Sequence, residues 1–202
     1  MSPPSLSPGQ PPCRRRLPRQ VRERQMLDAA VAVFSRRGFH LASMDDIAEV
    51  AGVSKPMIYA YLGSKDDLFI ACIRREGQRL MELISAAVSA GLTRDERLYR
   101  GLLAFFEFVT DHRDGWIVLY RQARVHGSFA GEIVAARQRI IVMVAVLLAR
   151  SSDDDAHARA MPLAHAVVGA AEALSDWALA HPEETPDALA TRLTTLLRGC
   201  AP

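Results

Sequence analysis

Residues 48–65 read AEVAGVSKPMIYAYLGSK and contain two short helical patterns separated by a glycine. Gly52 interrupts the first pattern, and the second begins after Ser54. Glycine adopts a positive φ at lower cost than other residues, so we expect Gly52 to form a tight turn. Two short helices joined by such a turn are typical of a helix-turn-helix. A helical hairpin inside a bundle has the same pattern, so the turn alone leaves both structures open.

Capping signals lie on either side of this stretch. Ser43 is followed three residues later by Asp46, and Ser64 by Asp67. Both pairs resemble capping boxes, with Asp in place of the usual Glu. The sequence therefore predicts helices that begin directly after residues 43 and 64.

The rest of the sequence is helical, with no alternating strand pattern and no internal repeat. A first helix is predicted from about Arg19 to Gly38, and six more helices follow residue 64. The predicted fold is all-α, with a three-helix helix-turn-helix domain joined to a six-helix domain. The predicted boundaries are a disordered basic arm at 1–18, the helix-turn-helix domain at 19–64, and a helical body at 65–202.

Composition and charge limit the class of protein. The net charge is +2, yet residues 14–75 hold 12 Lys or Arg against 7 Asp or Glu, which indicates a polyanionic partner at that end. No run of about 18 apolar residues occurs, so no membrane span is expected. The three cysteines form no CxxC pair, and the N-terminus has no apolar signal region. We therefore expect a cytoplasmic protein with no disulfide framework, metal or cofactor.

The second short helix presents an outward face that suits DNA. It is too short to be a useful member of a bundle, and its outward side chains are donors and aromatic rings. We expect this helix in the major groove of double-stranded DNA, with Ser54, Lys55, Met57 and Tyr61 reading bases. The alternatives are packing against the next helix for Tyr59 and Tyr61, and a solvated side chain for Lys55.

Residues 22–69 resemble the N-terminal DNA-binding domain of the TetR family of transcriptional regulators. The matching segments are MLDAA at 26–30, FSRRGF at 34–39, SMDDIAEVAGVS at 43–54, IY at 58–59 and SKDDL at 64–68. The resemblance implies phosphate contacts from Ser43, Tyr59 and Lys65. Leu62 stands where the family usually has Phe, and Ala60 replaces a frequent aromatic residue or His.

The resemblance also implies that the body binds a small-molecule effector and forms a homodimer, and that the protein represses at a palindromic operator. The predicted ligand contacts are Phe105, Phe106, Val109, Trp116, Tyr120, Arg121, Arg124, Phe129 and His165. The predicted dimer contacts, on the last two helices, are Ala164, Val168, Ala171, Leu189, Leu193 and Leu196. Burial in the core of one chain is the alternative for the apolar members of both sets.

Two other classes of function remain open. An architectural DNA-binding protein would need no effector and would show little sequence preference. A helical enzyme would need a catalytic constellation, and the sequence has no nucleophile elbow, phosphate loop, HExxH or paired-carboxylate signature. His157, His165 and Glu172 share roughly one helical face, but such spacing is common on surface helices. We therefore predict a regulator that is not an enzyme.

Overall fold

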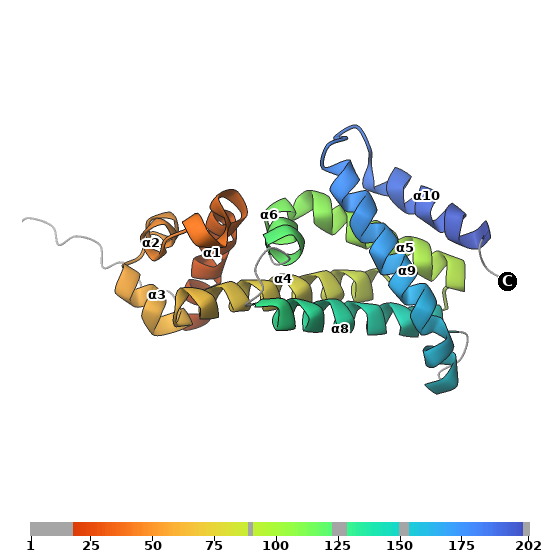
Figure 1. Cartoon of the computed structure of the whole chain (residues 1–202), viewed down its shortest axis with the longest axis horizontal. Coiled ribbons are helices and arrows are strands. Elements are labelled where there is room, and N and C mark those ends of the chain that lie inside the picture. The colour runs from red at the N-terminus through yellow and green to blue at the C-terminus, as the bar shows by residue number, and fades with distance from the viewer. Residues whose placement is uncertain (1–17, 89–90, 123–128, 150–153, 200–202) are drawn as a thin grey trace, which may run out of the picture.

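The computed structural model describes residues 18–88, 91–122, 129–149 and 154–199, and its elements there are all helical (Figure 1). In chain order they are α1 (Arg19–Leu41), α2 (Met44–Ala51), α3 (Lys55–Leu62), α4 (Lys65–Ala87), α5 (Arg94–Asp111), α6 (Arg113–Trp116), η1 (Ile117–Gln122), α8 (Ala130–Leu148), α9 (Asp154–Ala178) and α10 (Pro186–Gly199). The π-helical segment η1 directly continues α6. With these two taken together, the described residues form nine helices, and the predicted all-α class is confirmed.

Local capping rules set the boundaries of α2, α3 and α4. The Ser43 hydroxyl accepts from the Asp46 amide at 3.0 Å, and the Asp46 carboxylate accepts from the Ser43 amide at 3.1 Å. Gly52 ends α2 in the left-handed conformation, with φ 64° and ψ 34°. Ser64 and Asp67 form the same reciprocal box at the start of α4. The predicted capping boxes and glycine turn are therefore confirmed.

α1 continues past its predicted end at Gly38. Gly38 has φ 74° and ψ 165°, so the helix is kinked there before it resumes and ends at Leu41. The Ala42 amide donates to the Gly38 carbonyl oxygen at 3.1 Å and closes this last turn. The glycine marks a bend because the residues after it return at once to helical geometry.

The long helix α4 belongs to both halves of the molecule. Near its start, Leu68 and Phe69 are buried with Phe34 of α1 in the core of the helix-turn-helix. Farther along, Leu80 and Ile84 are buried in the body. Figure 1 shows α4 leaving α3 and running beside α8 under the rest of the body.

The rest of the body is built from two packed pairs of helices, and α8 of the first pair lies beside α4. α9 crosses and packs against α8, and α10 packs against α5 (Figure 1). α9 continues through Pro162, which lies inside the helix. Among the described residues, none of the helices is long and apolar enough to span a membrane.

A buried carboxylate lies where α4 meets α6 and α1. Glu76 of α4 is 1% exposed, and its carboxylate lies against the backbone of Gly115 in α6. The Arg75 guanidinium pairs with Glu76 at 2.7 Å and with Asp28 of α1 at 2.8 Å. Ionic contacts therefore connect α4 to α1 at the point where α6 packs onto both.

Candidate DNA-binding face and effector cavity

The exposed face of α3 consists of Lys55, Pro56, Tyr59 and Ala60. Ile58 is fully buried and holds the helix on the core, whereas Tyr59 is 47% exposed. Residues four apart share a helical face, so these four residues form two adjacent rows that point away from the protein. Sequence reasoning missed Pro56 and Ala60. The spacing would have identified them: Pro56 and Ala60 are four residues apart and directly follow Lys55 and Tyr59, so the two pairs lie side by side on one helical face.

Met57 and Tyr61 lie on another side of α3, toward the start of α1. Arg22 Nη1 donates to Met57 Sδ at 3.3 Å, and the Arg19 guanidinium carbon lies 5.2 Å from the centroid of the Tyr61 ring. Both α3 side chains are half-buried. The structure thus separates these two predicted base-reading residues from the exposed face.

The residues predicted to bind phosphate have structural partners within the chain. The Ser43 hydroxyl donates to Asp46 Oδ2 at 2.8 Å as part of the capping box. Hydrogen bonds from Ser43 hold the pKa of the Asp46 carboxyl below its ordinary value. Lys65 Nζ donates to the His40 carbonyl oxygen at 3.2 Å and lies 4.6 Å from the Phe39 ring centroid. These contacts fix both groups at helix N-termini, where anions are favoured.

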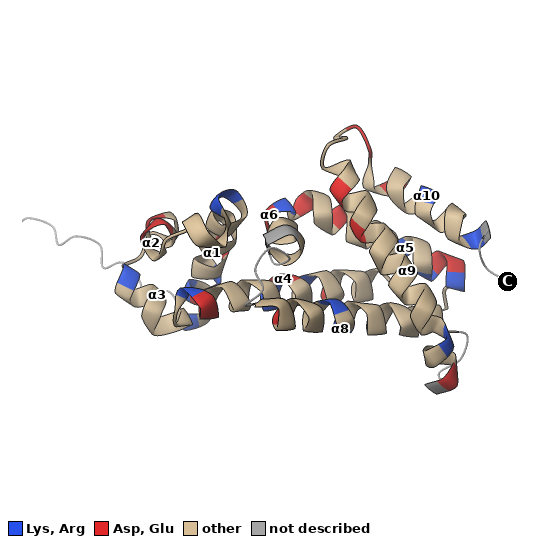
Figure 2. Ribbon diagram, viewed as in Figure 1, with Lys and Arg blue, Asp and Glu red and all other residues tan. Residues whose placement is uncertain are grey.

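Lys55 forms an exposed ion pair with an acidic residue of α2. Its Nζ donates to Asp45 Oδ2 at 2.8 Å, and this hydrogen bond and the charge of Asp45 raise the pKa of Lys55. Figure 2 shows the basic start of α3 close to the acidic part of α2. Ser54, just before Lys55, is exposed, and its side chain makes no capping hydrogen bond. Exposed ion pairs are weak, so little free energy holds the Lys55 side chain to Asp45.

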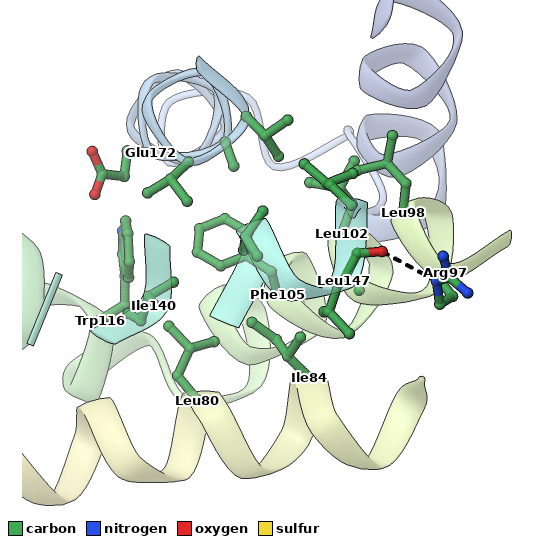
Figure 3. Close-up of a pocket in the computed structure, with 16 residues that line it drawn as sticks. Leu80, Ile84, Arg97, Leu98, Leu102, Phe105, Trp116, Ile140, Leu147 and Glu172 are labelled. Atoms are coloured by element: carbon green, nitrogen blue, oxygen red, sulfur yellow. Dashed lines mark hydrogen bonds between the residues drawn. The ribbon is translucent and has the colours of Figure 1, made fainter. Parts of the chain in front are cut away.

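The body encloses an apolar cavity between α4, α5, α8 and α9 (Figure 3). We call it the inner cavity, and its volume is about 60 Å³. The apolar side chains around it include Leu80, Ile84, Leu102, Phe105, Ile140, Val144, Val168 and Ala171. Such a lining favours apolar ligands.

Polar groups occur only near the two ends of the inner cavity among its described lining residues. Trp116 and Glu172 lie at one end, and Arg97 at the other (Figure 3). Arg97 donates to the carbonyl oxygens of Leu147 at 3.1 Å and Leu92 at 3.2 Å, so its charge is directed at the backbone. Trp116 Nε1 is buried and has no hydrogen-bond acceptor among the residues that the structure describes.

A second hollow of about 340 Å³ adjoins the inner cavity. It shares Trp116, Ile140 and Glu172 with that cavity, and it includes the exposed residue Val134, so it reaches the surface. We call it the outer hollow. Arg137 donates to Glu172 through Nε at 2.9 Å and through Nη2 at 3.1 Å, in a two-point ion pair where the hollow and the cavity meet.

The predicted ligand residues divide between these spaces and the core. Phe105 and Trp116 line the inner cavity, and Trp116 and Tyr120 line the outer hollow. Phe106 and Val109 are buried but line neither space. Neighbouring positions on α5 thus point into different surroundings.

Two further predicted ligand residues lie elsewhere. The Phe129 ring packs against Phe39 at 4.8 Å and Phe69 at 5.0 Å between centroids, beside the helix-turn-helix core. His165 is exposed on α9, with its Nδ1 2.9 Å from the Met161 carbonyl oxygen. Neither residue lines the inner cavity or the outer hollow.

The remaining predicted ligand residues, the side chain of Arg121 and the whole of Arg124, lie outside the described parts of the chain. The charged residues that border the two spaces are Arg97, Arg137 and Glu172, which sequence reasoning did not select as ligand contacts. Arg137 had a usable signal, because it interrupts the apolar run from 133 to 149.

The predicted dimer residues are mostly inside the chain. The five buried ones are Ala164, Val168, Ala171, Leu189 and Leu193. They face the interior because α9 packs on α8 and α10 packs on α5. Leu196 is 63% exposed, and Trp177, which was not selected, is 42% exposed. The surface that a second copy can reach therefore differs from the predicted one.

Comparison with known families identifies the class of protein. Residues 26–72 match the family model described as bacterial regulatory proteins, tetR family. Residues 94–198, about half of the chain, match the model described as tetracyclin repressor-like, C-terminal domain. The chain therefore belongs to the TetR family of transcriptional regulators, with a DNA-binding helix-turn-helix domain and a ligand-binding domain. The family is one of regulators and not of enzymes.

Individual relatives agree with this assignment. A solved TetR-like transcriptional regulator from Rhodococcus sp. RHA1 is 50% identical with a TM-score of 0.76, over 92% of this chain and 98% of that one. The transcriptional activator FasR of Mycolicibacterium smegmatis is 34% identical over 70% of this chain and 65% of its own length. The chain spans between about half and two thirds of the curated relatives that it matches. FadR of Bacillus subtilis, solved with stearoyl-CoA, has a TM-score of 0.72 at 19% identity, covers 86% of this chain and 96% of its own, and shares the fold.

Proposed function

We propose that this protein is a repressor that binds a palindromic operator as a homodimer and leaves it when a small molecule fills the inner cavity. The observation that carries the proposal is the course of α4. This helix begins beside α3 and continues to the cavity, where Leu80 and Ile84 line the wall. A ligand that moves these side chains also moves the helix that supports the DNA-binding domain. A protein that acts on chromosomal DNA works in the cytoplasm, so we expect it there.

In this proposal the exposed face of α3 enters the major groove. Lys55 leaves Asp45 and donates to guanine O6 or N7, while Pro56 and Ala60 pack on thymine methyl groups. The Tyr59 hydroxyl donates to a phosphate. These contacts follow from the exposure of the four side chains on two adjacent rows of the helix.

The flanking contacts go to the sugar–phosphate backbone. Ser43 and Lys65 lie at the starts of α2 and α4, where the helix dipole favours a phosphate. Such contacts position a protein on DNA without reading its sequence. Met57 and Tyr61 act indirectly, because they hold α3 against the start of α1.

A second connection runs from the cavity through α6. Trp116 lines the cavity, and Asp114 in the same short helix accepts from the Ser35 hydroxyl of α1 at 2.7 Å. Gly115 between them lies on the buried Glu76 carboxylate. A shift of Trp116 on ligand binding therefore acts on α1 as well as on α4.

Two-fold symmetry would match the palindrome, with the two recognition helices about 34–36 Å apart or a multiple of that spacing. We propose that a second copy covers exposed parts of α9 and α10, among them Trp177 of α9 and Leu196 of α10. Large exposed apolar side chains on adjacent helices suit an isologous contact between two copies.

Fluorescence anisotropy with the DNA upstream of the protein's own gene tests the DNA-binding part. We expect tight, salt-sensitive binding of at least two chains per site and much weaker binding to scrambled DNA. Equal, weak binding to both DNAs at two salt concentrations would oppose a sequence-specific regulator acting at this site and favour an architectural protein.

Activation of transcription is a second candidate, because the relative FasR is named a transcriptional activator. Transcription in vitro from the bound promoter separates the two. A repressor lowers transcript yield when added to polymerase, whereas an activator raises it. Catalytic turnover of a compound that enters the cavity would oppose both.

A further inference from the structure

Leu41 is the most exposed of the large apolar side chains that the structure describes, at 78%. It lies in the short segment between the kink at Gly38 and the start of α2. Its neighbours in the chain are held to the core, since the Phe39 ring packs against Phe69 with 5.0 Å between centroids and Ala42 is buried. The Leu41 side chain therefore projects into solvent from a fixed part of the helix-turn-helix domain.

The position of Leu41 distinguishes it from the single exposed leucines that are ordinary on protein surfaces. Lys65 Nζ donates at 3.2 Å to the carbonyl oxygen of His40, the residue directly before Leu41. Ser43, two residues after Leu41, caps the start of α2. Leu41 thus lies between the two groups to which we assign phosphate contacts, on a domain whose family binds DNA.

The sugar is the part of the DNA backbone that an apolar side chain can cover. Along one strand a sugar lies between each pair of successive phosphates, so a side chain between two phosphate contacts meets a sugar. Deoxyribose carries only hydrogen at its 2′ carbon, and leucine can pack there without burying a polar group. Ribose has a 2′-hydroxyl at this point, which leucine would bury without a hydrogen-bond partner.

We propose that Leu41 packs on a deoxyribose of the operator and selects DNA over RNA at that position. The contact reads the kind of sugar and no base, so it complements the base contacts of α3. This inference rests on the proposed operator binding and on the phosphate contacts of Ser43 and Lys65.

Fluorescence anisotropy of the full chain with single-ribonucleotide duplexes tests the proposal. The parent duplex is the DNA sequence that the full chain enriches from a random pool. Each test duplex replaces one deoxyribonucleotide by the matching ribonucleotide, so the phosphates remain and only a hydroxyl is added. We expect one position in each half-site at which the ribonucleotide weakens binding about fivefold or more, as for a hydroxyl buried without a partner.

Two substitutions of Leu41 then assign that position to this side chain. Leu41→Ala should bind the all-DNA duplex about fivefold more weakly, because apolar burial is lost, and it should no longer distinguish the ribonucleotide. Its salt dependence should be unchanged, since no phosphate contact is removed. Leu41→Asn, which can bond a hydroxyl, should bind the ribonucleotide duplex at least as tightly as the all-DNA duplex.

Val146→Ala is the matched control, because Val146 is an exposed apolar residue of α8 in the body. This variant should keep the affinity and the ribonucleotide penalty of the unchanged protein. Leu41→Ala should also keep the Tm of the unchanged protein, because position 41 is exposed, so weaker binding would not reflect unfolding.

Three results would overturn the sugar contact. They are equal binding of the unchanged protein to every single-ribonucleotide duplex, a ribonucleotide penalty that persists in Leu41→Ala, and a salt slope that falls by about one unit in Leu41→Ala, as a lost phosphate contact would give. These results would leave the proposed function intact, because the parent duplex would still be bound. If the pool yielded no enriched sequence, both the operator and the sugar contact would be refuted.

Discussion

Gly115→Ala should destabilise the protein, although alanine is normally the better residue in a helix. A Cβ at Gly115 would lie 3.0 Å from Cδ and 3.2 Å from Cγ of Glu76, and closer still to Glu76 Oε2. The carboxylate has little room to withdraw, because it is 1% exposed and is held by Arg75 at 2.7 Å and by Arg79 at 3.5 Å. Either this ionic cluster or α6 must shift.

The size of the effect follows from two opposing contributions. Forcing a methyl group into a packed site costs about 1–3 kcal/mol. Replacing glycine by alanine in a helix recovers up to about 1 kcal/mol. The expected net loss is about 1–2 kcal/mol, and a chain of this length loses about 2–4 °C in Tm per kcal/mol. We therefore expect Tm to fall by about 2–8 °C.

Thermal unfolding followed by circular dichroism measures this change. Gly131→Ala is the matched control, because Gly131 lies in α8 and a Cβ there would meet nothing within 4 Å. This control should be neutral or slightly stabilising. If Gly115→Ala were as stable as Gly131→Ala, close packing of α6 on Glu76 would be refuted.

Three further predictions concern DNA, assembly and acid. Lys65→Ala should weaken binding to all DNA sequences alike and lower the salt dependence of the binding constant by about one unit, whereas Lys55→Ala should alter base preference. Fluorescence anisotropy with single-base variants of the operator tells the two effects apart. A base-specific loss of affinity in Lys65→Ala would contradict the proposed phosphate contact of Lys65. Trp177→Glu should give monomers in sedimentation velocity, and an intact dimer would exclude the proposed interface. Hydrogen bonds from Ser43 lower the pKa of Asp46 below its ordinary 3.8. The ionised Asp46 therefore stabilises the fold above about pH 4, and this stabilisation is lost as the pH falls further and the carboxylate is protonated. Asp46→Asn should reduce Tm at neutral pH and flatten its acid dependence, and an unchanged acid slope would show that the box does not contribute.

The features predicted well from the sequence are those decided by neighbouring residues. Ser43 with Asp46, and Ser64 with Asp67, are three residues apart, and each pair satisfies the exposed amides of its own helix. Gly52 takes its positive φ because the chain must turn within one residue. None of these depends on contacts with distant parts of the chain.

The features that depend on distant contacts were harder to predict. Phe105 and Phe106 are adjacent and both buried, but only Phe105 lines the cavity, because the choice is set by how α5 meets α8 and α9. Leu193 has the apolar spacing of an interface residue and is used instead to pack α10 on the body. An apolar face shows that a helix is covered, and it does not show which element covers it.

The ion pair between Lys55 and Asp45 affects how the protein would search a chromosome. While α3 is away from DNA, Asp45 forms an ion pair with the Lys55 ammonium group. The negative charge of Asp45 also repels any phosphate that approaches. In the mode of DNA binding proposed above, a random DNA segment would gain little from Lys55, while a well-placed guanine would replace Asp45 fully as the partner of the ammonium. Off-target complexes would then be shorter-lived, so a carboxylate that lowers overall affinity would increase the contrast between the operator and the rest of the genome.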